Sequence, residues 1–249
     1  MNHGLVDVVV PVFNPGSEFR ETMASITGQS YRNLRIIVVD DGSNEEASGY
    51  IRSICDLDER IELTRLSKNQ GGGAARNLAL TISSAPYVAF CDADDRWPLN
   101  KIETQISLLR SGADFTHTDM RELTLLPDRC DYRWRVSKEI IALDDFLETT
   151  GIFCSSVVLR REIIQGARFG SMKARHPFKF WCHILSRGYK SVRAPGCYFD
   201  YVKREQSVSS NKFKMLFYTL SAYVFYVPDK RKAFKKAVRR FERYLRDRK

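Results

Sequence analysis

A mostly parallel α/β sheet with helices on both faces is the fold class that this 249-residue sequence predicts. Its first half alternates short apolar stretches of strand length with segments whose apolar residues recur every three or four positions. The strands are continuously apolar, as expected when helices cover both faces of a parallel sheet. Beyond residue 206 the pattern changes, and we expect a helical C-terminal extension there.

Strands and helices are expected to take turns along the first half of the chain. Turn residues mark their boundaries, such as Asn14-Pro15-Gly16 after the first strand and the glycines at 71–73 before the third helix. The expected strands are 5–12, 34–39, 61–66 and 86–91, and the expected helices are 18–29, 45–55, 72–83 and 99–110.

The second half is less regular. Apolar alternation predicts strands and amphipathic spacing predicts helices, but the two no longer take turns. The expected strands are 113–118, 120–126, 154–159 and 191–201, and the expected helices are 142–148 and 178–186.

Composition excludes several classes of protein. The amino terminus shows no basic region or cleavage site of a signal peptide, and no apolar run reaches the length of a membrane span. The six cysteines lack a Cys-x-x-Cys spacing, which argues against a disulfide framework or a cysteine metal site. We therefore expect a cytoplasmic protein.

The most informative segment is the acidic loop, Asp92-Ala93-Asp94-Asp95, which follows an apolar strand. In open α/β sheets, ligands bind outside the carboxyl ends of the strands. Clustered carboxylates at that edge suit Mg²⁺ or Mn²⁺, which keep open positions for substrate phosphates. The structural alternative is a solvated acidic turn that caps the next helix.

Two further polar clusters are expected at the same edge of the sheet. Asp40 and Asp41 follow the second strand, where they can accept hydrogen bonds from a ribose or a base, or simply shape a turn. Gly71 opens a helix whose amino terminus favours a phosphate, and Arg76 adds a permanent charge for a diphosphate. Together with the acidic loop, these clusters match the parts of a nucleotide diphosphate bound with a metal.

Four ordered motifs resemble the family 2 glycosyltransferases of the GT-A fold, of the bacterial surface-polysaccharide type. The motifs are Val8-Val9-Val10-Pro11-Val12-Phe13-Asn14, Ile36-Ile37-Val38-Val39-Asp40-Asp41-Gly42-Ser43, Ala75-Arg76-Asn77 with Asn69 before it, and Phe90-Cys91-Asp92-Ala93-Asp94-Asp95. The resemblance covers residues 5–110 strongly and 150–210 loosely. It implies an inverting enzyme that transfers a sugar from a nucleotide diphosphate donor, commonly UDP, with Mn²⁺ or Mg²⁺.

The resemblance also assigns roles to residues and divides the chain. Residues 1–110 become the nucleotide-sugar half of a GT-A domain, 111–206 its acceptor-side half, and 207–249 the extension. Asp94 and Asp92 are implied as metal ligands, and Trp97 and Trp181 are candidates for the acceptor side. The implied donor-binding residues are Pro11, Phe13, Asn14, Asp40, Asp41, Gly71, Arg76, Asp92, Ala93 and Asp94.

The segment that carries the catalytic base departs from the family pattern. Inverting transfer needs a group that takes the proton of the acceptor hydroxyl, and Pro177 stands where the family has an aspartate. His176 is the candidate base, and its alternative is a surface histidine at a helix start. Other candidates are the carboxylates Asp114, Asp119, Asp144 and Asp145. A third reading is a catalytically impaired homologue that binds nucleotide sugars.

The extension concentrates the positive charge. Residues 228–249 contain eleven Lys or Arg against three acidic residues, so they hold eight of the ten net charges of the chain. An aromatic apolar segment precedes them, and residues 213–249 together suit an anionic membrane surface at its cytoplasmic face. The alternative is a helix packed on its own domain. A saccharide or lipid-linked saccharide acceptor fits the membrane interpretation. Nucleic-acid binding would also explain the charge, but no nucleic-acid fold or stacking motif accompanies it, so no nucleic-acid partner is expected.

Overall fold

The computed structural model describes residues 4–125, 130–148, 151–170 and 176–202. In the extension it describes Ser221, Tyr223, Val224, Arg231, residues 234–239 and Glu242.

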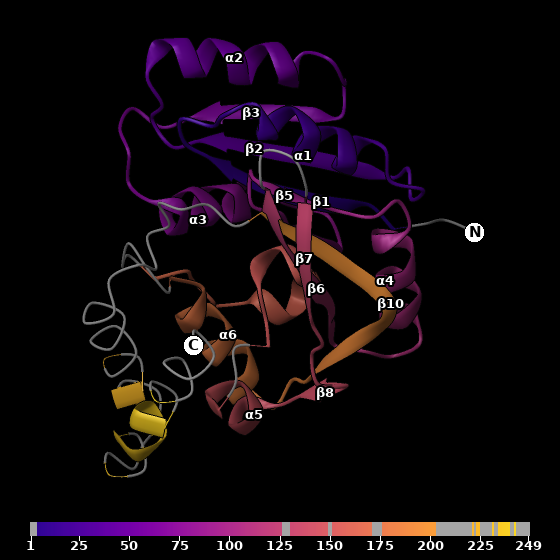
Figure 1. Ribbon diagram of the computed structural model, residues 1–249, viewed down its shortest axis with the longest axis vertical. Helices are drawn as coiled ribbons and strands as arrows, with labels where there is room; N and C mark the ends of the chain where they lie inside the picture. The colour runs from indigo at the N-terminus through magenta and orange to yellow at the C-terminus, as the bar shows by residue number, and fades with distance from the viewer. Residues whose placement is uncertain are drawn as a thin grey trace.

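One mixed, mostly parallel sheet runs through the protein, in the order β3-β2-β1-β4-β9-β6-β10-β5, with β7 beside β6 and β8 beside β10 (Figure 1). β9 is antiparallel to both of its neighbours, β4 and β6. The strands are β1 (Val6–Val12), β2 (Leu34–Asp40), β3 (Ile61–Arg65), β4 (Tyr87–Phe90), β5 (Asp95–Arg96), β6 (Phe115–Leu125), β7 (Cys130–Arg135), β8 (Ile140–Ile141), β9 (Val158–Arg160) and β10 (Ser191–Val202).

Helices cover both faces of this sheet, as predicted (Figure 1). Alternate residues of β1 show why: Val8 packs with the helices of one face and Val9 with those of the other. One face, called here the α4 face, carries α1 (Glu18–Thr27), α2 (Glu45–Cys55) and α4 (Lys101–Arg110). The opposite α6 face carries α3 (Gly72–Ile82), α5 (Leu143–Glu148) and α6 (His176–Ser186).

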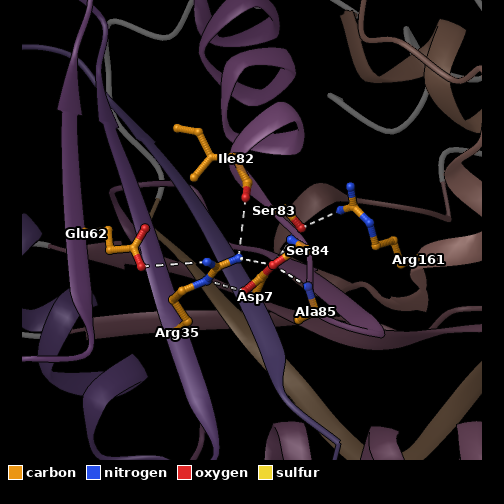
Figure 2. A network of polar contacts seen from close by, with 8 residues as sticks. All are labelled: Asp7, Arg35, Glu62, Ile82, Ser83, Ser84, Ala85 and Arg161. Atoms are coloured by element: carbon orange, nitrogen blue, oxygen red, sulfur yellow. Dashed lines mark hydrogen bonds and ion pairs between the residues drawn. The ribbon is translucent and has the colours of Figure 1, made fainter.

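A buried ion pair fastens the amino ends of the first strands (Figure 2). Asp7 of β1 is fully buried and accepts two hydrogen bonds from Arg35 of β2, at 2.7 and 2.8 Å, and two more from the amides of Ser84 and Ala85. Burial acts to raise the pKa of Asp7, but the hydrogen bonds from Arg35 and the two amides lower it below its ordinary value. The network joins β1, β2 and the turn before β4, opposite the edge where the acidic loop lies.

Three expectations about the second half were wrong. The expected break at Asp119 is absent, because β6 is one strand from Phe115 to Leu125; its pairing with β10 shifts register between Arg193 and Tyr198 and resumes at Asp119. Cys154–Ser156 form a 3₁₀ turn, so the strand expected at 154–159 begins only at Val158. β5, β7 and β8 were not predicted, because two of them have two residues each and β7 is exposed along its whole length.

The described parts of the extension pack on α5 and α6. Tyr223 is fully buried with its ring 5.6 Å from that of Phe178, and Ala237 is fully buried in the core of the α6 face. Lys236 donates a hydrogen bond of 2.6 Å to Asp144 at the start of α5. The packing of Tyr223, Lys236 and Ala237 agrees with the alternative prediction, in which the extension packs on its own domain. Phe234, by contrast, is 58% exposed.

Candidate functional site

The predicted motifs meet at the carboxyl ends of β1, β2 and β4. The strand order reverses between β1 and β4, because the chain passes from β3 through α3 to the other side of β1. Such a switch point opens the crevice in which α/β sheets bind their ligands. The acidic loop follows β4 at this point, and Asn14 follows β1.

Hydrogen bonds join the ends of the first two strands. The amide of Asn14 donates to the Ser43 hydroxyl at 2.9 Å, and the Asn14 side chain accepts from the amide of Asn44 at 3.0 Å. Asn14 has a φ of 41°, a left-handed conformation that asparagine tolerates better than most residues. Phe13 beside it is 47% exposed, whereas Pro11 lies buried within β1. Of the predicted residues in and just after β1, Phe13 and Asn14 are therefore the accessible ones.

Asp41 shapes the loop that leads into α3. Its two carboxylate oxygens accept hydrogen bonds of 2.8 Å from the amides of Gln70 and Gly71. The turn after β2 comes so close to this loop that a Cβ on Gly42 would lie 2.4 Å from the carbonyl carbon of Lys68. Asp41 was predicted to contact the donor, and in the structure its carboxylate bonds to the protein backbone.

Asp40, the last residue of β2, is 1% exposed. Its Oδ1 accepts a hydrogen bond of 2.9 Å from the amide of Ser43. Its Oδ2 lies 3.4 Å from Arg65 Nε and accepts no hydrogen bond from any residue in the described part of the chain. A buried acceptor of this kind ordinarily needs a partner, so Asp40 is the better candidate of the pair for a donor contact.

Arg76 connects the start of α3 with the acidic loop. It is 4% exposed, pairs with Asp92 through Nη2, and donates a hydrogen bond of 3.0 Å to the carbonyl of Gly72. Its guanidinium lies 5.6 Å from the centroid of the Phe169 ring. Arg76 was predicted to lie at the donor diphosphate, and in this structure it contacts the acidic loop through its ion pair with Asp92.

The three carboxylates of the acidic loop are not equivalent. Asp95 is 2% exposed, and its burial, with the charges of Asp92 and Asp94 beside it, raises its pKa well above the ordinary value. The side chain of Asp92 is 42% exposed, and Asp94 is partly exposed. Asp95 is therefore closed off inside the protein, and Asp92 and Asp94 are the carboxylates of the loop that a cation could reach.

Ser155, which the sequence did not indicate, holds the acidic loop in place. Its hydroxyl accepts a hydrogen bond of 2.9 Å from the amide of Asp92 and donates one to the carboxyl of Asp95. On the other side of the loop, the Thr22 hydroxyl donates to the carbonyl of Ala93 at 3.0 Å. No motif surrounds Ser155, and a serine within an apolar stretch is the one sequence signal that it gives.

The residues fit a magnesium or manganese ion of the kind that nucleotide diphosphates carry. Among the described residues no three His, Cys, Asp or Glu side chains gather as a complete metal cage. A cage is not required, because Mg²⁺ is usually bound by one or two carboxylates together with substrate phosphates and waters. Asp92 and Asp94 would supply two hard oxygen ligands at the edge where the diphosphate is expected.

Both tryptophans predicted on the acceptor side are buried. Trp181 is fully buried with its ring stacked on that of Phe115, and Trp97 is 5% exposed with its indole N–H donated to the carbonyl of Ser155. Neither ring offers a face to an acceptor, so this expectation is corrected. An aromatic residue gives the same sequence signal in a core as at a site, and packing decided between them.

The segment expected to carry the base begins α6. His176 is the first residue of the helix and Pro177 the second, which suits proline because first-turn amides have no helical partner. The side chain of His176 lies outside the described part of the structure.

The Asp119 carboxylate accepts hydrogen bonds from the Ser137 amide at 2.8 Å and from Arg193 at 3.2 Å. It projects from the α6 face of β6, because β6 side chains alternate and Phe115 packs on α6.

The other carboxylates considered as bases are occupied elsewhere. Asp114 accepts a hydrogen bond from the Lys190 amide at 3.2 Å, just before β6 begins. Asp144 and Asp145 pair with Lys236 and Lys138, each at 2.6 Å, at the start of α5. Asp119 is therefore the carboxylate of this group that lies toward the carboxyl ends of the strands.

Set beside solved structures, this fold is the GT-A fold of glycosyltransferases. TarS of S. aureus, solved as residues 1–349 in complex with UDP-GlcNAc, superposes with a TM-score of 0.70 over 97% of this chain and 72% of its own, at 16% identity. The mannosyltransferase PcManGT of Pyrobaculum calidifontis, solved with GDP-Man and Mn²⁺, gives a TM-score of 0.66 over 92% of this chain and 66% of its own, at 18% identity.

The chain belongs to glycosyl transferase family 2, whose model matches residues 7–166. It is 29% identical to WfgD of Escherichia coli, a UDP-Glc:alpha-D-GlcNAc-diphosphoundecaprenol beta-1,3-glucosyltransferase, over 87% of this chain and 84% of WfgD. It is also 29% identical to TuaG of Bacillus subtilis (strain 168), provisionally named as a glycosyltransferase of teichuronic acid biosynthesis, over 84% of this chain and 83% of TuaG. The family predicted from the four motifs is confirmed.

Replacing Arg76 with alanine is expected to weaken the binding of UDP about 10- to 100-fold and that of uridine less than about threefold. A charge-assisted contact is worth roughly 1.5–3 kcal/mol, and it is lost whether Arg76 contacts the diphosphate or positions Asp92. Calorimetry with both ligands in the presence of Mn²⁺ measures the difference. Arg52→Ala, which removes an equal charge from an exposed position on α2, is the matched control. Equal losses for UDP and uridine would contradict the assignment.

Proposed function

We propose that the protein is an inverting glycosyltransferase that moves a sugar from a nucleotide diphosphate donor, best matched by UDP, to a saccharide or lipid-linked saccharide. The observation that carries the proposal is the ion pair between Arg76 and Asp92. It joins a helix start suited to phosphate with a carboxylate loop suited to a divalent cation. The similarity to WfgD, named as a glucosyltransferase that uses UDP-Glc, and to TuaG, named for teichuronic acid biosynthesis, supports a place in surface-polysaccharide synthesis.

Each part of the site has a role in this reaction. Phe13, Asn14 and Asp40 would receive the nucleoside, and the amino terminus of α3 would face the diphosphate. Asp92 and Asp94 would hold Mg²⁺ or Mn²⁺. When bound, such an ion neutralises the charge that gathers on the departing diphosphate. Thr22 and Ser155 keep the carboxylates in place before the donor arrives.

Inversion requires a single displacement at the anomeric carbon. The acceptor hydroxyl oxygen forms the new bond to that carbon, the bond to the diphosphate oxygen breaks, and a base receives the hydroxyl proton. Pro177 cannot accept a proton, so we assign this role to His176 at the start of α6, with Asp119 as the carboxylate alternative. His176→Ala and Asp119→Asn, assayed separately, distinguish the two.

The proposal is tested by donor binding and transfer measured on the same protein. We expect UDP to bind only with Mn²⁺ or Mg²⁺, and UDP-glucose to donate its sugar to an alkyl diphosphate ester of N-acetylglucosamine. This ester is a water-soluble mimic of alpha-D-GlcNAc-diphosphoundecaprenol, the acceptor for which WfgD is named. Binding without transfer from any of a panel of nucleotide sugars would favour an impaired homologue. Failure of every nucleotide diphosphate to bind would refute the proposal.

A position at the cytoplasmic membrane surface is the second part of the proposal. No helix in the described part of the chain is long and apolar enough to cross a membrane. While Tyr223 and Ala237 pack on the domain, Phe234, Lys235 and Arg239 are exposed. An exposed aromatic ring with basic residues after it suits an anionic leaflet.

Reversing two exposed charges of the extension, with Lys235→Glu and Arg239→Glu together, is expected to release the protein from vesicles that contain phosphatidylglycerol. Each basic residue near such a surface is worth about 1 kcal/mol, so a loss of at least about tenfold in partitioning is expected. UDP affinity should stay unchanged. Arg20→Glu with Arg52→Glu makes the same charge change on α1 and α2, and vesicle sedimentation compares the two pairs. A similar release by both pairs would show that net charge alone matters.

A further inference from the structure

One face of β6 passes from beneath α6 to the outside of the protein. Its alternate residues Phe115, His117, Asp119 and Arg121 point to the same side of the sheet. Phe115 is fully buried, with its ring parallel to that of Trp181 of α6. The side chain of Arg121, six residues further along, is 30% exposed. The α6 face of the sheet is therefore covered at one end of β6 and accessible at the other.

The accessible end of β6 lies at the height of the acidic loop. Val158 of β9 pairs with both Ala89 of β4 and Thr116 of β6, so these two residues are level. β4 and β6 run in the same direction, because both are antiparallel to β9. Asp92, three residues beyond Ala89, is consequently level with the part of β6 around Asp119.

The pairing of β10 gives the same result. Asp200 pairs with Arg121 of β6 on one side and with Arg96 of β5 on the other, and β5 contains the last residue of the acidic loop. Trp134 of β7 pairs with Arg121 from the far side. Four neighbouring strands thus lead from the acidic loop to Trp134.

A compact cluster, called here the Trp134 platform, occupies this accessible end. It consists of Trp134, Tyr198, Arg121 and Asp200. The rings of Trp134 and Tyr198 meet edge to face with their centroids 5.1 Å apart. The Arg121 guanidinium lies 4.7 Å from the centroid of the Tyr198 ring, and it donates hydrogen bonds of 2.6 and 2.8 Å to Asp200. Trp134 is nevertheless 46% exposed.

The chemistry of the platform suits a sugar ring. A pyranose has an apolar face of C–H groups, which packs against an indole, and a rim of hydroxyls, which needs donors and acceptors beside it. Each Asp200 oxygen has two lone pairs and accepts one hydrogen bond from Arg121, which leaves acceptor capacity for a hydroxyl. The ion pair adds no net charge, and it fixes both partners before a ligand binds, which lowers the entropy cost of binding.

We propose that the Trp134 platform binds a pyranose ring of the acceptor saccharide, with Trp134 stacked on the sugar face and the Arg121–Asp200 pair bonded to its hydroxyls. The inference rests on the proposed function, since it names the acceptor subsite of that reaction. The exposed Trp134 of β7 thereby takes the acceptor-side role that the sequence suggested for the buried Trp97 and Trp181.

Trp134 provides its own reporter for the test. Of the three tryptophans, Trp97 and Trp181 are 5% and 0% exposed, so acrylamide quenching of the fluorescence reports mainly on Trp134. We expect the N-acetylglucosamine diphosphate ester to protect the wild-type protein from quenching, and this protection to vanish in Trp134→Phe.

Trp134→Ala should raise the KM for the ester about tenfold, and Trp134→Phe should raise it less, because it keeps a smaller ring. UDP affinity should stay within about twofold of wild type. Arg133→Ala, on the opposite face of β7, is the matched control and should leave both readouts unchanged.

The outcomes separate this inference from the proposed function. Normal transfer with an unchanged KM in both Trp134 variants would overturn the platform and leave the enzyme activity standing. If the wild type binds UDP and transfers nothing to the ester, the quenching experiment decides. Protection from quenching by the ester supports the platform, and the absence of protection up to the solubility limit of the ester overturns it. A rise in the KM for the ester in Arg133→Ala equal to that in Trp134→Ala would assign the effect to the strand as a whole and also overturn the proposal.

Discussion

Asp94→Ala is expected to abolish the metal dependence of UDP binding and to lower the affinity for UDP in Mn²⁺ by about 100-fold or more. The loss of supporting groups around a bound metal typically costs 10- to 100-fold, and Asp94 is proposed as a direct ligand. The remaining Asp92 is already paired with Arg76 through one of its oxygens, which weakens it as a sole protein ligand. Isothermal calorimetry with UDP, with and without MnCl₂, measures the effect.

Asp95 supplies the matched control for this experiment. It is adjacent in sequence, but it is buried and bonded to the Ser155 hydroxyl, so Asp95→Asn removes a carboxylate that a cation cannot reach and keeps the shape of the side chain. We expect Asp95→Asn to keep UDP affinity within about threefold of wild type. If Asp95→Asn abolished metal dependence and Asp94→Ala did not, the assignment of the two carboxylates would be reversed.

Lys101→Met is expected to stabilise the protein by roughly 2 kcal/mol at pH 7 and to flatten its stability above that pH. Lys101 is fully buried, with its ammonium 4.0 Å from the centroid of the Trp97 ring and 2.8 Å from Gln105 Oε1. Burial lowers the pKa of Lys101 to about 7 from 10.5. A shift of this size corresponds to about 4 kcal/mol at neutral pH, and leaving Gln105 without its donor offsets about 2 kcal/mol of the gain.

The pH dependence follows from the direction of the shift. Between about pH 7 and 10.5 the unfolded chain holds a proton on Lys101 that the folded chain has released. Stability therefore rises with pH across this window, and below about pH 7 the lysine imposes a constant penalty because both states are protonated. Urea denaturation of wild type and Lys101→Met at a series of pH values tests this. Lys68→Met, at an exposed position, should behave as wild type, and a Lys101→Met curve parallel to that of wild type would contradict the shift.

The elements of the first half could be predicted closely because their signals are local. The strand expected at 34–39 is β2 from Leu34 to Asp40, and the helix expected at 45–55 is α2 over the same residues. Continuous apolar strands and amphipathic helices encode the two covered faces directly. The motifs at their ends could be placed together for the same reason, since parallel strands bring their carboxyl ends to one edge.

The second half could be predicted less well because distant partners define its elements. β9 is a strand because it fits between β4 and β6, and β7, which is exposed along its whole length, is a strand because it pairs with β6. Ser155 holds the acidic loop from 60 residues away in sequence, through a hydrogen bond that no local pattern announces. Contacts of this kind arise only when the chain has folded.

The sequence by itself determined the fold class, the family and the edge of the sheet where the site lies, because spacing, polarity and motif order act locally along the chain. Only the tertiary structure decided which side chains are accessible there. Burial separated Asp95 from its two neighbouring carboxylates and Trp134 from the other two tryptophans. Burial depends on what packs against a residue from elsewhere in the chain, so the residue type alone does not predict it.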